Sequence, residues 1–242
     1  DTQENQEIAP HHDHGDGPVR RRFAVDRAVG EELQGDVLAV DVVGLVGAQL
    51  RYPDGLLFWD FDDPYLYIAD LPGLVAMVQM GVLEIHPWGV TVANPAKADR
   101  IVFDLDPGEG VGWPQVQQAA QLVRAMLAEL GLPAFLKTSG GKGLHVVVPL
   151  VPKLGYDVVK GFSQAVVTHL AKTIPERFVA RSGGSNRVGR IFIDYLRNGA
   201  RQTTAAAFSA RSRPGLGVSM PVAWEQLMAL KGGAQWTITT AR

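Results

Sequence analysis

The sequence contains no cysteine among its 242 residues, and this absence excludes disulfides and metal sites built on thiolates. It also lacks any apolar run approaching the roughly 18 residues that a membrane-spanning helix needs. Its first residues do not have the pattern of a signal peptide. We therefore expect no membrane partner and a cytoplasmic location. With a net charge of −2, the sequence lacks the basic excess of a protein that coats nucleic acid.

Positive charge is nevertheless concentrated between residues 177 and 213, where Asp194 is the one acidic residue. The arginines of this stretch are Arg177, Arg181, Arg187, Arg190, Arg197, Arg201, Arg211 and Arg213. A stretch of this kind can bind the phosphates of a nucleic acid.

The chain divides into a polar start and two further parts. Residues 1–22 are polar and aperiodic, and are predicted to form a disordered tail. We expect an N-terminal subdomain over residues 23–85 and a second subdomain over residues 86–242. The strand patterns of the N-terminal subdomain cover residues 36–43, 48–52, 55–61 and 65–69.

Strands and helices alternate after residue 70, which predicts an α/β (α+β) fold with a sheet covered by helices. Helix patterns cover residues 71–81, 113–131, 157–173 and 221–233. Strand patterns cover residues 83–88, 100–106, 134–139, 144–150 and 190–196.

Two aspartates interrupt the strand pattern of residues 100–106. Asp104 and Asp106 stand two residues apart, so both side chains leave the same face of the strand, about 7 Å apart. Two like charges at that spacing raise each other's pKa unless a cation lies between them, and a hard divalent cation takes oxygen ligands. The pair therefore suggests a metal site. The alternative is that one aspartate caps the following turn and the other is solvated.

A third aspartate, Asp194, lies within the apolar strand pattern of residues 190–196. A carboxylate in a central strand is costly unless it is paired or bound to metal, so a salt bridge to a nearby arginine is the alternative to a metal ligand. Together with Asp104 and Asp106, it suggests a site for two metal ions. Such a site aligns an in-line phosphoryl displacement.

Residues 139–143 read Ser-Gly-Gly-Lys-Gly and join two strand patterns. A glycine-rich turn offers backbone N–H groups to phosphate oxygens, and Lys142 adds a positive charge. Ser139 and His145 offer further donors. The spacing is not that of a P-loop, and a strand follows rather than a helix. The alternative is a glycine hairpin with an exposed lysine.

Two further residues gain meaning only from their surroundings. His86 precedes a proline and is expected in extended backbone, where by itself it would be a core histidine. Arg211 lies in a loop and by itself would be an ordinary surface arginine.

Five segments together resemble the polymerase domain of bacterial DNA ligase D, which belongs to the archaeo-eukaryotic primase superfamily. They are LEIHPW, DRIVFDLDPG, KTSGGKGLHVVVPL, RIFIDYLRN and ARSRPGLGVSMP, within about residues 64–225. That family extends DNA ends during non-homologous end joining. The resemblance implies a catalytic sheet like that of an RNA-recognition motif, flanked by helices, with an N-terminal subdomain packed on it.

The resemblance also implies roles for particular residues. The implied catalytic residues, and ligands of two Mn²⁺ or Mg²⁺ ions, are Asp104, Asp106 and Asp194. One ion would lie between all three aspartates, and the other would be held mainly by Asp104 and Asp106. The implied contacts to the incoming nucleotide are His86, Ser139, Lys142, His145 and Arg211, with Arg187 as a basic residue near the site.

The partners that the resemblance implies are nucleoside triphosphates, with ribonucleotides favoured, and a DNA primer–template or a broken DNA end. It further implies a ligase domain, a Ku-type end-binding protein and a place at the bacterial nucleoid. No ligase or phosphoesterase motif is visible, so we expect a stand-alone polymerase or an excised domain.

Two other functions compete with this interpretation. A phosphatase of the haloacid dehalogenase type would carry DxDGT after a strand, but Pro107 stands where that motif needs glycine, and its later acidic pair is not apparent. A catalytically silent nucleic-acid-binding module would use the arginine-rich stretch, but it would gain nothing from three carboxylates. Metal-dependent nucleotide transfer separates these functions.

Overall fold

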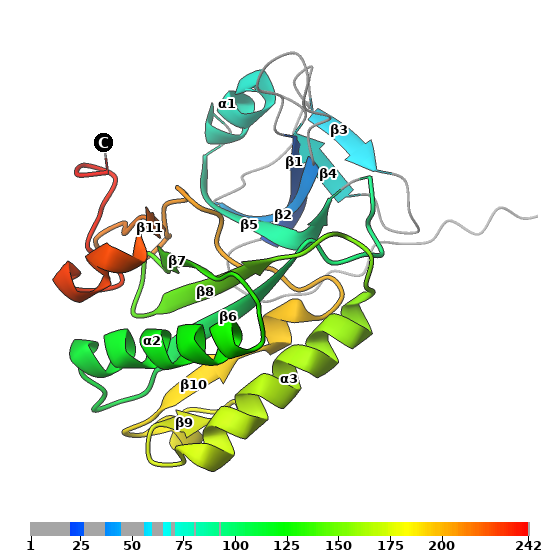
Figure 1. Cartoon of the computed structure of the whole chain (residues 1–242). Coiled ribbons are helices and arrows are strands. Elements are labelled where there is room, and N and C mark those ends of the chain that lie inside the picture. The colour runs from blue at the N-terminus through cyan, green and yellow to red at the C-terminus, as the bar shows by residue number, and fades with distance from the viewer. Residues whose placement is uncertain are drawn as a thin grey trace, which may run out of the picture.

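Two β-sheets, one above the other in Figure 1, form the framework of the structure. The computed structural model describes residues 20–26, 37–44, 56–59, 65–68, 71–79, 81–91 and 93–241, and side chains within the last three ranges. The expected strand over residues 48–52 and residues 1–19 of the expected tail lie outside the described residues. The last three residues of that expected tail, 20–22, are not disordered but form the start of a strand.

The N-terminal sheet has the strand order β3-β4-β1-β2-β5. Its strands are β1 (Arg20–Asp26), β2 (Val37–Gly44), β3 (Leu56–Trp59), β4 (Tyr65–Ile68) and β5 (Val82–Thr91). Helix α1 (Leu71–Gln79) precedes β5. Between the two lies Gly81, whose φ of +80° is a conformation that glycine adopts without strain. The helix and most strands predicted for this region are therefore present.

The second sheet has the order β11-β7-β8-β6-β10-β9 and carries the long helices. Its strands are β6 (Arg100–Pro107), β7 (Phe135–Thr138), β8 (Leu144–Pro149), β9 (Phe178–Val179), β10 (Ile191–Asp194) and β11 (Pro221–Val222). The helices are α2 (Trp113–Glu129) and α3 (Tyr156–Thr173), with short 3₁₀ turns η1 (Ser185–Arg187) and η2 (Leu196–Asn198). The predicted α/β fold is confirmed.

Helices α2 and α3 cover one face of this sheet, and Figure 1 shows both lying in front of it. Phe103 and Leu105 of β6 are fully buried on that face, against side chains such as Val123 of α2 and Val166 of α3. Because side chains alternate along a strand, Asp104 and Asp106 must leave the opposite face. Burial of the apolar residues on one side thus fixes where the two carboxylates point.

The predicted closing helix over residues 221–233 is wrong. The structure has strand β11 and then a single 3₁₀ segment, η3 (Trp224–Ala229). Side chains of α2 hydrogen-bond to backbone carbonyls of this segment. The Gln117 amide of α2 donates to the Leu227 carbonyl (2.7 Å), and the Trp113 indole donates to the Leu230 carbonyl (2.6 Å). Packing against α2 therefore overrides the local helical pattern.

Strand β5 links the two sheets. It pairs with β2 of the N-terminal sheet, and its backbone also bonds to the segment 203–206, as in the bond from the Ala206 N–H to the Ile85 carbonyl (2.8 Å). The expected subdomain boundary between residues 85 and 86 falls inside this strand. The change of sheet lies instead between β5 and β6.

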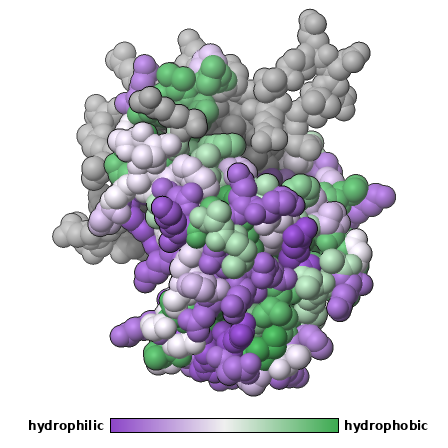
Figure 2. Space-filling model, turned by 60° about the vertical axis from the view of Figure 1, so that its left-hand side comes forward, coloured by the Kyte–Doolittle hydropathy of each residue, from purple (hydrophilic) through white to green (hydrophobic). Residues whose placement is uncertain are grey.

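The outer surface in the view of Figure 2 is largely hydrophilic, with apolar residues in separate groups. One apolar group lies over α1, where Leu71, Val75 and Val78 are exposed. No helix among the described residues is long and apolar enough to cross a membrane.

Candidate active site

The fold brings the three aspartates onto neighbouring strands. Asp194 of β10 lies directly opposite Asp104 of β6 in an antiparallel pair, and Asp106 follows two residues along β6. Directly opposed residues share a face of the sheet and have Cβ atoms roughly 5 Å apart. All three carboxylates therefore leave the face that α2 and α3 do not cover.

The strand registers extend this arrangement into a row across four strands. Lys137 of β7 pairs with His145 of β8, His145 pairs with Asp104, and Asp104 pairs with Asp194. The His145 Nε2 atom lies 3.4 Å from the Asp104 carboxylate. His145 is buried beside the aspartates, and its other ring nitrogen, Nδ1, has no hydrogen-bond partner among the described residues. We refer to Lys137, His145, Asp104 and Asp194 as the polar row.

Burial shifts the pKa of three members of the polar row, Asp104, Lys137 and His145. Burial raises the pKa of Asp104 to about 6, with further help from Asp194 and Asp106, while positive charges on Arg197 and Lys137 oppose that shift. Burial lowers the pKa of Lys137 to about 7, against the attraction of Asp104. Burial and nearby positive charges hold the pKa of His145 well below its usual value, so the ring is neutral at pH 7. The positive charges near Asp104 therefore do not fully offset the effect of its burial.

Two arginines contact the aspartates in this structure. The Arg187 guanidinium pairs with the Asp106 carboxylate. Arg197 Nε lies 2.9 Å from one Asp194 oxygen, and the Leu196 N–H donates to the other (2.9 Å). Within the described part of the chain, no three His, Asp or Glu side chains come close enough to hold a metal ion together. The carboxylate oxygens nevertheless have the chemistry that Mg²⁺ and Mn²⁺ prefer.

The Ser-Gly-Gly-Lys-Gly turn follows β7, next to the polar row. The Ser139 hydroxyl accepts the N–H groups of Gly141 and Gly143 (3.1 Å each), so it shapes the turn while its own O–H stays available as a donor. Gly143 packs so closely on β6 that an added Cβ atom would lie 2.0 Å from the Leu105 carbonyl oxygen. Lys142 is exposed at the tip.

A groove of about 790 Å³ opens beside this turn. Its lining residues are Pro107, Gly108, Glu109, Val111, Trp113, Val116, Gly141, Lys142, Lys231, Gly232, Gly233, Ala234 and Gln235. It begins directly after Asp106 and includes Lys142, but Trp113 and Val116 of α2 line it and the three aspartates do not, so it opens at the α2 side of the sheet.

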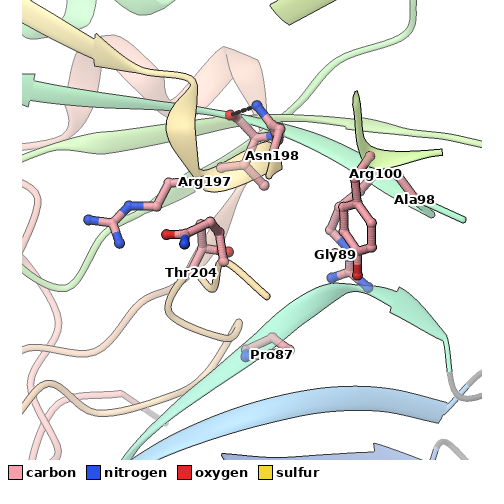
Figure 3. A pocket seen from close by; sticks show the side chains of 10 residues that line it. Pro87, Gly89, Ala98, Arg100, Arg197, Asn198 and Thr204 are labelled. Atoms are coloured by element: carbon pink, nitrogen blue, oxygen red, sulfur yellow. Dashed lines mark hydrogen bonds between the residues drawn. The ribbon is translucent and has the colours of Figure 1, made fainter. Parts of the chain in front are cut away.

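A second, much smaller pocket of about 10 Å³ lies between β5 of the N-terminal sheet and β6 of the second sheet. Figure 3 shows Pro87 and Gly89 of β5 on one side and Asn198 and Thr204 on the other. The Tyr156 hydroxyl beside it is buried without a hydrogen-bond partner among the described residues. This volume admits about one water molecule, so a nucleotide must lie outside it.

His86 and Arg211 meet at a residue that the sequence did not single out, Glu84. The His86 ring contacts the Glu84 carboxylate, and Arg211 Nε donates to the same oxygen (2.6 Å). Arg211 also donates to the Ser139 carbonyl (2.7 Å). The structure therefore joins His86, Arg211 and the glycine-rich turn, which come from three distant parts of the chain.

Comparison with known proteins places these features in a family. A family model described as "LigD, primase-polymerase domain" matches residues 59–242. The multifunctional non-homologous end joining protein LigD of Pseudomonas aeruginosa is 51% identical over 175 residues, which cover 72% of this chain and 21% of that protein. LigD of Mycolicibacterium smegmatis is 36% identical over 165 residues, covering 67% of this chain and 22% of that protein.

A solved structure gives the same result for the fold. The polymerase domain of Mycobacterium tuberculosis ligase D, in complex with DNA, superposes with a TM-score of 0.71 and 30% identity over 90% of this chain and 78% of that chain. The expected archaeo-eukaryotic primase fold is thereby confirmed. The comparisons favour the polymerase over the phosphatase and the silent binding module. The chain spans about a fifth of the length of the curated relatives.

Proposed function

The chain belongs to the primase-polymerase domain family of LigD, and from this we propose that it is a template-directed nucleotidyltransferase that extends broken DNA ends during end joining. The observation that carries the proposal is the polar row, where Asp104 and Asp194 face each other beside a glycine-rich turn. In the proposed reaction the 3′-hydroxyl of a DNA primer attacks the α-phosphate of a nucleoside triphosphate. One phosphodiester bond forms, and pyrophosphate leaves.

We propose that Asp104, Asp106 and Asp194 hold two divalent cations, Mn²⁺ or Mg²⁺. Bound cations of this kind lower the pKa of an attacking hydroxyl and neutralise phosphate charge. The raised pKa of Asp104 supports the assignment, because a buried group of carboxylates favours the binding of positive charge. Arg187 and Arg197 provide part of that charge in the structure, and Arg187 competes with a metal ion for the Asp106 carboxylate.

We propose that the glycine-rich turn binds the triphosphate. Lys142 at its tip supplies charge, and Ser139 retains a hydroxyl donor. Arg211 approaches the same turn from a distant loop, through its bond to the Ser139 carbonyl. The neutral ring of His145 lies deeper, against Asp104, so we assign it to the orientation of that carboxylate. Its contact with the nucleotide stays a prediction.

Further features of the function follow from kinship. We propose that ribonucleotides are preferred, and that a ligase domain and a Ku-type end-binding protein assist the reaction. The setting would be the bacterial cytoplasm, at the nucleoid, where broken chromosomal DNA lies.

Extension of a labelled primer–template tests the proposed function. The protein is incubated with each ribonucleotide and deoxyribonucleotide in turn, with Mn²⁺, with Mg²⁺ or with EDTA. We expect template-dependent addition in the presence of either metal and none with EDTA. Release of inorganic phosphate from small phosphoesters without primer extension would instead favour the phosphatase.

Removing the lysine of the turn should weaken nucleotide use more than DNA binding. A charge-assisted hydrogen bond contributes about 1.5–3 kcal/mol, so Lys142→Ala should raise the nucleotide KM roughly 10- to 150-fold. The DNA affinity in gel shifts should change little. Lys153→Ala removes an exposed lysine elsewhere and serves as the matched control. A large loss of DNA affinity with a normal nucleotide KM would move Lys142 to the DNA groove.

Releasing Asp106 from its arginine should strengthen metal binding. Because both side chains of the Arg187–Asp106 pair are partly exposed, the pair contributes at most about 1 kcal/mol. Arg187→Gln should therefore lower the dissociation constant for Mn²⁺, measured by electron paramagnetic resonance without DNA, by up to about fivefold. The control Arg181→Gln removes an exposed charge from the same segment and should have a smaller effect. Equal effects of the two variants would show that only the general charge of the segment matters.

A further inference from the structure

Glu84 is a buried acidic residue on β5 whose carboxylate receives three donors. The His86 ring and Arg211 Nε contact its Oε1 atom, the latter at 2.6 Å. The Ser212 backbone N–H donates to its Oε2 atom (2.7 Å). The residue is 6% exposed, so a bound substrate has little access to it. Both oxygens of Glu84 are thus committed to other parts of the protein.

The contacts of Glu84 fix the direction of the Arg211 side chain. Nε is held by Glu84, and a terminal nitrogen donates to the Ser139 carbonyl (2.7 Å). A guanidinium group is planar and carries five N–H donors, so two contacts on different sides set its plane and leave other donors for a ligand. Arg211 is therefore held in one orientation beside the glycine-rich turn.

The Glu84 carboxylate stays negatively charged at neutral pH. Burial by itself would raise its pKa, but the hydrogen bonds from His86 and the Ser212 N–H and the charge of Arg211 lower the pKa to about 2. The carboxylate is therefore ionised at any pH at which the protein would function. It remains a charged anchor for both partners.

We propose that Glu84 is a positioning residue for the incoming nucleotide, which holds His86 and Arg211 in place through direct contacts. The inference rests on the proposed function and deepens it, because these two side chains are the proposed nucleotide contacts from the N-terminal sheet and from the loop between η2 and β11. Glu84 does not touch the nucleotide. It sets the orientation of the two side chains that do, through its contacts with His86 and with Arg211.

Backbone hydrogen bonds support the same link independently of Glu84. The Ala206 N–H donates to the Ile85 carbonyl (2.8 Å), and the Thr204 N–H donates to the Pro87 carbonyl (3.3 Å). β5 and this loop therefore stay joined when the charge of Glu84 is removed. A variant at Glu84 should accordingly change the orientation of Arg211 more than it changes the fold.

Equilibrium binding of a fluorescent ribonucleoside triphosphate, with Mn²⁺ present, is the primary test. Glu84→Gln keeps the size of the side chain and removes its charge, and it should weaken nucleotide binding roughly tenfold. Binding of primer–template DNA should be unchanged. Glu129→Gln, at an exposed position on α2, is the matched control and should bind nucleotide normally. Normal nucleotide binding by Glu84→Gln would overturn the proposal.

A double-mutant cycle separates positioning from general stability. If Glu84 acts through Arg211, the losses of Glu84→Gln and Arg211→Gln should not multiply, and the double variant should bind nucleotide about as weakly as Arg211→Gln by itself. The double variant also removes both charges, so it leaves no unpaired arginine to destabilise the protein. Losses that multiply would refute positioning through Arg211, even if Glu84→Gln is less stable than the wild type.

The same assays distinguish this inference from the proposed function. A wild-type protein that binds nucleotide but adds none to a primer would contradict the polymerase, while the binding cycle would still decide the role of Glu84. A wild-type protein that extends primers, with a nucleotide KM unaffected by Glu84→Gln, would leave the polymerase intact and overturn the positioning role. A wild type that binds no nucleotide would overturn both.

Discussion

Replacing Asp104 with asparagine is expected to reduce nucleotide addition at least a hundredfold without destabilising the metal-free protein. The first effect follows because Asp104 lies opposite Asp194 and beside Asp106, and is one of the two carboxylates that both proposed cations share. The second follows because the variant removes one of three clustered negative charges, which relieves repulsion and the cost of burying a charge. Primer extension and thermal unfolding in EDTA measure the two effects.

The difference in stability between Asp104→Asn and the wild type should depend on pH. The pKa of Asp104 is raised from 3.8 to about 6 in the native protein, so folding favours its protonated form. The stabilisation from that proton is complete below pH 3.8 and is lost as the pH rises through about 6. Metal-free Asp104→Asn should therefore gain melting temperature relative to the wild type between pH 5 and pH 7.5.

Added Mn²⁺ should reverse the order. It should raise the melting temperature of the wild type at pH 7.5 and leave Asp104→Asn nearly unchanged, because binding to the native state stabilises it. Glu176→Gln, at an exposed position before β9, controls for the loss of a surface carboxylate. Extension at the wild-type rate by Asp104→Asn would refute the metal site.

The sequence was most informative where a strand has one buried face. The alternation in residues 100–106 was enough to place Asp104 and Asp106 on one face, because Phe103 and Leu105 had to enter the core. It could not show which strand would lie beside β6. That Asp194 faces Asp104 depends on the order β8-β6-β10, which is set by the packing of α2 and α3 and by β9 at the sheet edge.

Two residues of the site were missed although the sequence contained a signal for each. Glu84 and His86 stand two apart on a strand, the same spacing that identified the aspartate pair, so both leave one face of β5. Lys137 follows from the hairpin: once the turn closes between Thr138 and Leu144, Lys137 must pair with His145. The pairing of Glu84 with Arg211, 127 residues apart, had no local signal.

The predicted helix over residues 221–233 failed for a different reason. The apolar spacing of Leu227 and Leu230 serves burial against α2, and it does so in one 3₁₀ turn that needs no longer helix. Side chains of α2 satisfy the backbone carbonyls at that position, and such distant partners cannot be read from a local pattern.

For Asp194 the sequence allowed two roles, a metal ligand and a salt-bridge partner. A salt bridge to a nearby arginine was the alternative to a metal ligand, and the structure contains that salt bridge, to Arg197. The same carboxylate lies opposite Asp104 and is 9% exposed. Its geometry therefore suits both roles, and a variant must be chosen for which the two roles give different results.

Asp194→Asn makes that distinction, because it keeps the shape of the side chain and removes its charge. If Asp194 holds the cation that activates the primer hydroxyl, single-turnover extension should fall at least a hundredfold, while the fluorescent nucleotide still binds through Lys142 and Arg211, within about threefold of the wild type. The loss of stability should stay within about 1 kcal/mol, because the Arg197 side chain is 40% exposed and water can solvate it.

Arg197→Gln breaks the same ion pair and is the matched control for the melting temperature, which it should lower by a similar amount. Arg197→Gln keeps all three carboxylates and should therefore still bind Mn²⁺, whereas Asp194→Asn should bind it more weakly. An Asp194→Asn protein that is unstable but extends primers normally would show that Asp194 serves only the salt bridge, and the assignment of the three aspartates as one metal site would then be wrong.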